Sequence, residues 1–197
     1  MKIVLYIILS LLVGQQMVAQ IDISKTLFDS ATHKRIYQIS ISDYQQIELI
    51  EDVNGQYSGT LTSAVWKVNR KEERKKILQQ KLTIPSKHVQ EIMNIGSLNN
   101  IENLESCKDV KGCVIGLDGR SVFFTIKTSK LSREYWYWEP ENDQYQDSSV
   151  VQIKNIRQIL KGIRKYIDLK MIFDSFINEL PFGKYSFGGV IITKRVN

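Results

Sequence analysis

The stretch CKDVKGCVIGLDGRSVFFTIKTSKLSREYWYWEP, residues 107–140, decides the fold we expect for this chain. Within residues 122–126 and again within 134–138, side chains alternate between apolar and mixed character, which is the pattern of a half-buried strand. A shorter apolar run covers 114–117, and Asp118-Gly119 after it is a strong signal for a two-residue hairpin turn. The sequence therefore predicts a three-stranded antiparallel meander, with Val122, Phe124, Ile126, Tyr135 and Tyr137 on its apolar faces.

The last strand of this meander carries the residues that we consider first for binding. Glu134, Trp136 and Trp138 share one face, which combines apolar bulk with charge, as the centres of protein interfaces do. We predict that one or both tryptophans stay partly exposed and bind a protein or glycan partner. The alternative is that both rings belong to the core and that the C-terminal helices cover them.

Residues 1–20 have the features of a secretory signal peptide. Lys2 forms the basic start, Ile3–Val13 the apolar centre, and Ala19 precedes a cleavage point after Ala19 or Gln20. No later apolar run is long enough for a transmembrane helix after cleavage. The segment, which ends in VAQ, resembles the leaders of exported proteins of the Bacteroidota type. This resemblance covers the first 20 residues and implies a periplasmic or secreted protein.

The mature chain, residues 21–197, has the length of a single α+β domain. The formal net charge of the whole chain is +6, a mild excess that does not indicate a nucleic-acid partner. In an oxidising compartment the only two cysteines, Cys107 and Cys113, are expected to form a disulfide, worth about 2.4 kcal/mol in the chain-entropy model.

Periodicity outside the meander predicts further strands and three helices. We expect strands over 35–41, 47–50, 57–68 and 190–193, and helices that follow Ser86, span 153–167, and run from an Asp168 cap to Leu180. Residues 70–82 fit both a helix face and a strand, and we predict a strand over 74–84 that pairs with 57–68. Together these elements indicate an α+β fold with six to eight mostly antiparallel strands, and with the two C-terminal helices packed on one sheet face.

The sequence offers little for catalysis. The two histidines lie far apart in the sequence, and it contains no nucleophile, phosphate-loop, dinucleotide or zinc motif. We therefore name no catalytic residue and expect no cofactor. The acidic loop 139–149 lacks the frame of a calcium loop, so we expect no metal site. We therefore expect an exported, non-catalytic protein that binds another macromolecule. The alternative is a carboxylate-dependent hydrolase of glycans or cell-wall material, using Asp118, Glu134 or Glu139.

Overall fold

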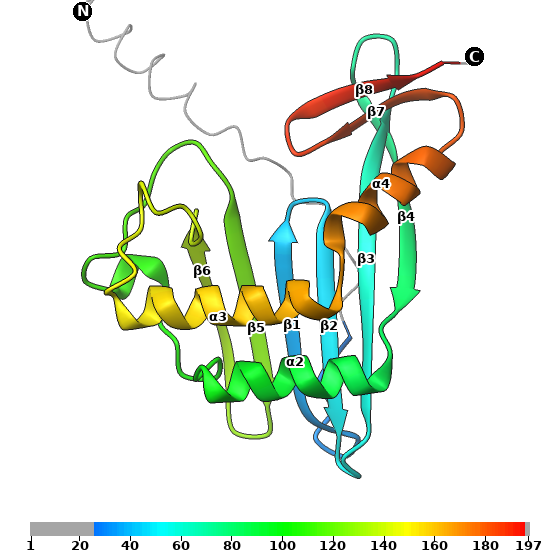
Figure 1. Ribbon diagram of the computed structural model, residues 1–197. Coiled ribbons are helices and arrows are strands. Elements are labelled where there is room, and N and C mark those ends of the chain that lie inside the picture. The colour runs from blue at the N-terminus through cyan, green and yellow to red at the C-terminus, as the bar shows by residue number, and fades with distance from the viewer. Residues whose placement is uncertain (1–25, 196–197) are drawn as a thin grey trace, which may run out of the picture.

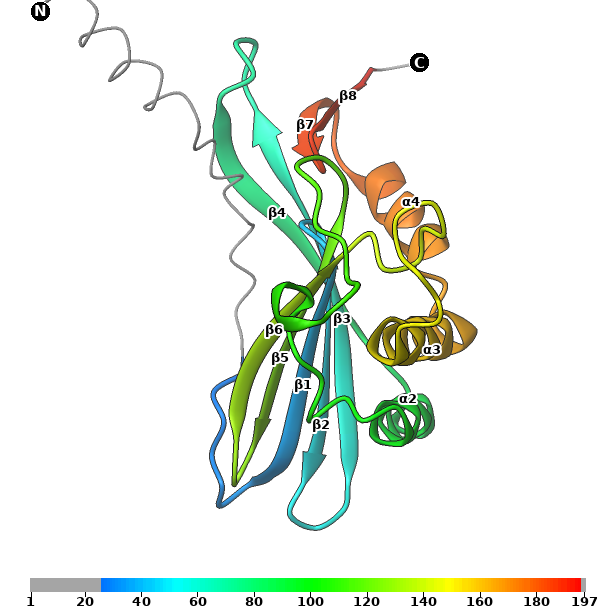
Figure 2. The same cartoon turned by 90° about the vertical axis from the view of Figure 1, so that its left-hand side faces the viewer.

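A computed structural model describes residues 26–195 of the chain, so the expected signal peptide, residues 1–20, lies outside the described part. Within that part, eight strands form one antiparallel sheet and three α-helices lie on one of its faces (Figures 1 and 2). The strands are β1 (His33–Ser42), β2 (Gln45–Asp52), β3 (Tyr57–Val68), β4 (Arg74–Thr83), β5 (Ser121–Thr128), β6 (Ser132–Trp138), β7 (Gly183–Phe187) and β8 (Val190–Lys194). The helices are α2 (Ser86–Leu98), α3 (Val151–Tyr166) and α4 (Leu169–Glu179), and a short 3-10 turn, η1, covers Cys107–Asp109. The predicted α+β class, with two C-terminal helices on one face, is confirmed.

The sheet runs in the order β6-β5-β1-β2-β3-β7-β8, and β4 pairs with β3. Residues 60–63 of β3 pair with both β2 and β4, and residues 66–68 with both β4 and β7. Strands β2 and β7 therefore follow one another along one edge of β3, and β4 takes the other edge. The predicted pairing of residues 74–84 with 57–68 is correct.

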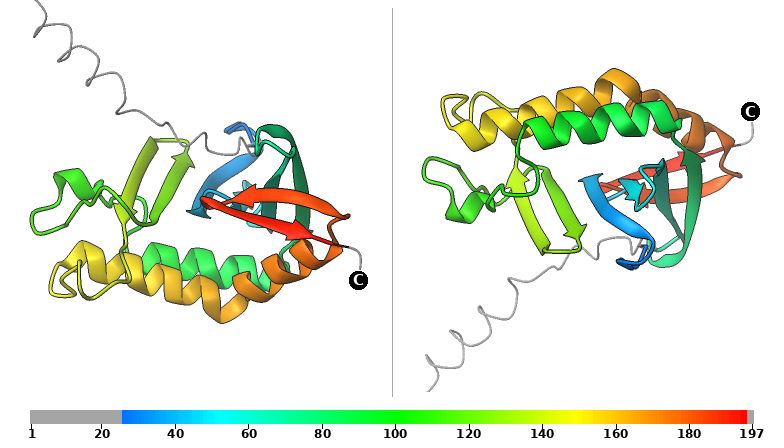
Figure 3. Two further views of the ribbon diagram at one scale, coloured as in Figure 1. Left: turned by 90° about the horizontal axis from the view of Figure 1, so that it is seen from above. Right: turned by 90° about the horizontal axis from the view of Figure 1, so that it is seen from below.

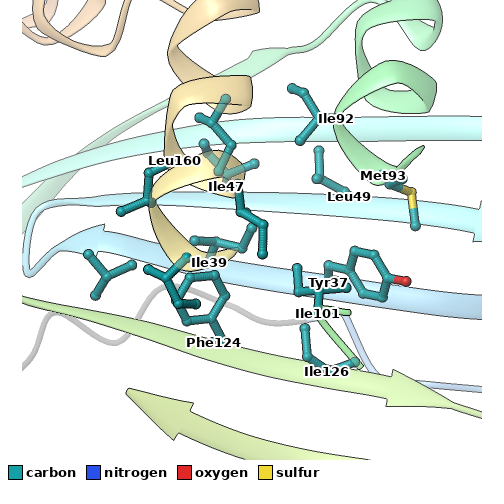
Figure 4. Packing of buried hydrophobic residues seen from close by; sticks show 14 of the residues in the cluster. Tyr37, Ile39, Ile47, Leu49, Ile92, Met93, Ile101, Phe124, Ile126 and Leu160 are labelled. Carbon is teal, nitrogen blue, oxygen red and sulfur yellow. The ribbon is translucent and has the colours of Figure 1, made fainter. Parts of the chain in front are cut away.

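The main core lies between the sheet and helices α2 and α3. Alternate side chains of β1, β2 and β5 point to these helices, as the close view of Tyr37, Leu49 and Phe124 shows (Figure 4). The two helices lie side by side (Figure 3). Gly162 permits their close approach, because a Cβ at this position would lie 2.9 Å from the side chain of Ile95.

The helix-free face of the sheet is polar near its centre. The register aligns Thr60, Glu48, Gln38, Thr125 and Glu134 in one row across β3, β2, β1, β5 and β6. Gln38 Nε2 donates to the Glu48 carboxylate at 2.7 Å. Thr26 donates to the same carboxylate through its backbone N–H at 3.0 Å and its hydroxyl at 2.7 Å. These bonds supply the buried carboxylate with the donors it needs.

Two sequence predictions about the meander need correction. The run 114–117 is irregular chain rather than a strand, and Asp118-Gly119 is not a hairpin turn, although Gly119 does adopt a φ of +121°. Strand β5 instead has β1 and β6 as its neighbours. The β5–β6 hairpin and its apolar face are as predicted.

Some element boundaries also differ from expectation. Pro85, not Ser86, occupies the position before the first helix, and that helix continues through Gly96 to Leu98. Asp168 caps α4 as expected, because its carboxylate accepts the Met171 N–H at 2.9 Å. Strand β7 was not predicted. It forms a hairpin with β8 across Gly188-Gly189, whose two positive φ angles suit glycine.

Candidate functional site

Trp138 belongs to the interior, but not for the reason that the sequence suggested. Its side chain lies on the helix-free face and is 8% exposed. The chain around Gly116 and Gly119 covers it so tightly that a Cβ on Gly116 would lie 2.2 Å from the ring. The indole N–H donates to the Asp118 carbonyl at 2.7 Å, and the Tyr145 ring packs 4.7 Å away. Loops, and not the C-terminal helices, therefore bury this ring.

Glu134 and Trp136 lie at the surface and line one groove. Glu134 is exposed, Trp136 is partly exposed, and the Phe123 ring lies 6.4 Å from the Trp136 ring, inclined at 35°. The groove has a volume of about 380 Å³ and runs between β6 and the chain before and within η1, which lies beside that strand (Figure 2). Its lining residues are Glu105, Ser106, Lys108, Asp109, Arg133, Glu134, Tyr135 and Trp136. We call it the β6 groove.

Side chains of β6 hydrogen-bond to the segment that leads into η1, which forms the opposite wall of the β6 groove. The Tyr135 hydroxyl donates to the Ile101 carbonyl and the Tyr137 hydroxyl to the Glu105 carbonyl, both at 2.6 Å. Arg133 donates to the Glu102 carbonyl at 3.4 Å. The wall is thus fixed by donors that alternate along one strand.

The two tyrosines are suited to this structural role in their protonated form. Burial raises the pKa of Tyr135, and the charges of other acidic groups near it raise it further. Burial also raises the pKa of Tyr137, with a further contribution from Glu105. Both hydroxyls therefore remain donors well into the alkaline range.

The disulfide closes the chain at the far end of this wall. Cys107, at the start of η1, is joined to Cys113, as the sequence predicted. Gln146 continues the connection, since its amide contacts both Val114 and the carbonyl of Trp138. Arg157 of α3 in turn donates to the Gln146 carbonyl at 3.0 Å and to the Pro140 carbonyl at 2.7 Å.

The outer edge of β6 is partly occupied by the chain itself. Because outward-pointing groups alternate along an antiparallel edge strand, they belong to Ser132, Glu134, Trp136 and Trp138. The Trp136 N–H is directed to the Ser106 hydroxyl at 3.4 Å, and the Trp138 carbonyl accepts from Gln146 Nε2 at 2.6 Å. Two of the backbone groups that a partner strand would use are therefore already bonded within the chain.

The three carboxylates considered for hydrolysis do not come together. Asp118 lies in the loop over Trp138, and Glu139 accepts the Arg120 N–H at 2.6 Å and lines a separate surface hollow. Only Glu134 reaches the β6 groove, where Glu105 and Asp109 join it. The sequence analysis did not identify Glu105 and Asp109 as site residues, because they precede β6 by more than twenty residues. The one sequence feature that pointed to this segment was the neighbouring Cys107.

The acidic loop, residues 139–149, forms ion pairs with helix α3. Arg157 pairs with Asp143 at 2.6 Å, and Arg164 forms a two-bond ion pair with Glu141. Within residues 26–195, no group of three histidine, cysteine, aspartate or glutamate side chains could hold a metal ion. The loop therefore binds two of the five basic side chains of α3.

No helix in the described part of the chain is long and apolar enough to cross a membrane. Comparisons with protein-family models, with curated proteins and with solved structures find no match to this chain. Of the surface hollows described, the β6 groove is the one that Glu134 and Trp136 line.

Proposed function

We propose that this chain is a non-catalytic, exported protein of the cell envelope that binds another macromolecule in the β6 groove. One observation carries the proposal. Glu134 and the partly exposed Trp136 line a groove of about 380 Å³, within the range of about 300–1,000 Å³ that ligand sites have. The expected signal peptide and the oxidised cysteines support export.

Site-specific photo-crosslinking in the envelope tests the binding role. A photoreactive phenylalanine replaces Lys108, which is exposed and lines the β6 groove. In the matched control it replaces Met171, which is 62% exposed on α4. We expect a discrete adduct from position 108 and none from position 171. The same adducts at both positions, or none at either, would contradict the proposal.

Export is tested by the intact mass of protein recovered from the periplasm or the medium. We expect a chain that begins near Gln20 or Ile21 and has no thiol that reacts with an alkylating reagent. Retention of Met1, or two reactive thiols, would argue against export into an oxidising compartment.

Hydrolysis of glycans or cell-wall material is the second candidate function, because Glu105, Asp109 and Glu134 line the same groove. Paired carboxyl groups are the usual catalysts of glycoside hydrolysis. Release of reducing ends from cell-wall glycan by the wild type, and its loss in both Glu134→Gln and Glu105→Gln, would favour the enzyme. Equal release by all three proteins would exclude these residues from catalysis.

A further inference from the structure

The charges of the β6 groove do not select a strongly charged ligand. Two cations, Lys108 and Arg133, stand against three carboxylates, Glu105, Asp109 and Glu134, which gives a net charge of −1. Carboxylates accept hydrogen bonds, the ammonium and guanidinium groups donate them, and the Ser106 hydroxyl can do both. Such a lining suits a neutral ligand that is rich in hydroxyl groups.

An extended peptide is a poor fit to the same groove. A peptide that adds to a sheet edge gains its affinity from successive main-chain bonds. Ser106 already takes the Trp136 N–H and Gln146 the Trp138 carbonyl, so an added peptide strand could not form a complete ladder along this edge. The binding free energy must therefore come mainly from side chains.

Trp136, one of the residues that line this polar groove, carries a large aromatic side chain. The residue is partly exposed and has the 42% exposed Phe123 beside it. A sugar ring has one comparatively apolar face of C–H groups and a rim of hydroxyls. An aromatic ring next to fixed donors and acceptors matches both parts of that surface.

We propose that the β6 groove binds a neutral oligosaccharide, with the Trp136 ring against a sugar face and Arg133, Asp109 and Glu134 hydrogen-bonded to its hydroxyls. This inference rests on the proposed binding function and adds the chemical class of the ligand. It commits to a carbohydrate, and binding of an unstructured peptide is an outcome that would contradict it.

Titration calorimetry with the mature protein tests the ligand class. The probes are four neutral tetrasaccharides, built from β-linked glucose, β-linked N-acetylglucosamine, α-linked glucose and β-linked mannose, with tetragalacturonate as the anionic comparison. We expect at least one neutral probe to bind the wild type more tightly than tetragalacturonate. Failure of all four neutral probes at several millimolar, or stronger binding of the anion, would overturn the carbohydrate proposal.

Three variants locate the binding. Trp136→Ala should weaken binding by about tenfold, the value of one aromatic contact. Glu134→Gln, at an exposed position where the amide oxygen can still accept from the Thr125 hydroxyl, should weaken it by about threefold or more. Trp66→Phe, a ring on β3 that packs near Arg74, should leave the affinity unchanged. Unchanged affinity in Trp136→Ala and Glu134→Gln together would overturn the assignment to this groove.

The two proposals can fail separately. Position-108 adducts without binding of any tetrasaccharide would keep the binding function and reject the carbohydrate. Tetrasaccharide binding that Trp66→Phe abolishes and Trp136→Ala leaves intact would reject the groove itself. Far-UV circular dichroism of each variant, compared with wild type, ensures that a loss of binding reports the site and not the fold.

Discussion

The side-chain amide of Gln146 pairs with the backbone of Val114 as a neighbouring strand would. Its Oε1 accepts the Val114 N–H at 3.1 Å, and its Nε2 donates to the Val114 carbonyl at 2.8 Å. The same Nε2 reaches the Trp138 carbonyl at 2.6 Å. One buried side chain therefore supplies three hydrogen bonds that join the disulfide loop to the end of β6.

Replacement of Gln146 by alanine should lower the free energy of unfolding by about 2–3 kcal/mol, because three backbone groups lose their partner in a buried place. Urea denaturation measures the change. Gln144→Ala is the matched control in the same loop, since this side chain is exposed, and should change stability by less than about 0.5 kcal/mol. If both variants match the wild type, the amide does not hold the loop.

Removal of the disulfide in Cys107→Ser/Cys113→Ser should destabilise the protein by about 2.4 kcal/mol in the chain-entropy model. The variant should also lose affinity at the β6 groove, because η1 forms part of its wall. Urea denaturation and calorimetry measure the two effects. Reduction of the wild type with dithiothreitol should reproduce both, and an unchanged stability after reduction would refute the prediction.

Stability should fall in the alkaline range because of buried tyrosines. Burial raises the pKa of Tyr135 above the value near 10 that tyrosine has in an unfolded chain. The folded state therefore holds this proton more tightly, and the resulting stability is complete below about pH 10 and declines as the pH rises further. Urea midpoints between about pH 8 and pH 11 measure the decline. Tyr135→Phe should decline less steeply, and equal slopes would contradict the assignment.

Stability should also fall in acid because of Glu51. Burial alone would raise the pKa of this carboxyl, but hydrogen bonds from Lys34 and Arg35 outweigh it and the pKa is lowered. The folded state thus favours the ionised form, so the contribution is present above about pH 4.3 and is lost as the pH falls below it. Glu51→Gln should be less stable at neutral pH and lose less on acidification.

The control for this charge pair is Glu73→Gln, whose partner Lys75 and own carboxylate are both exposed. Its stability should lie within about 1 kcal/mol of wild type at neutral pH. Urea denaturation of the three proteins at neutral pH and near pH 3 decides between them. A Glu51→Gln curve that coincides with the Glu73→Gln curve at both values would count against the buried ion pair.

Local patterns predicted the strands and helices well because most of them bury one face. The alternation in β5 and β6 is visible in the sequence, and so is the stripe of α3. The error at residues 114–117 has a long-range cause. Strand β1, some eighty residues earlier in the chain, pairs with the edge of β5 that residues 114–117 were expected to take. Asp118-Gly119 therefore does not connect two paired strands.

The site was predictable only in part for a similar reason. Alternation placed Glu134 and Trp136 on an accessible part of the sheet, and both line the β6 groove. The same alternation grouped Trp138 with them, although the loop through Gly116 buries it. Burial by a loop depends on tertiary contacts, here those of Gln146, which strand periodicity does not contain.

The hydrogen bonds from Thr26 to Glu48 determine from which side of the sheet an N-terminal tether would leave the protein. Thr26 is held on the helix-free side of the sheet, because Glu48 lies on that face. A tether fused directly to Thr26, in place of residues 1–25, therefore leaves from that side. When the protein is immobilised on a sensor chip through such a tether, the helical layer is turned toward the solution. A tether placed after β8 gives a second orientation, and a ligand that binds in one arrangement only would reveal which side the support obstructs.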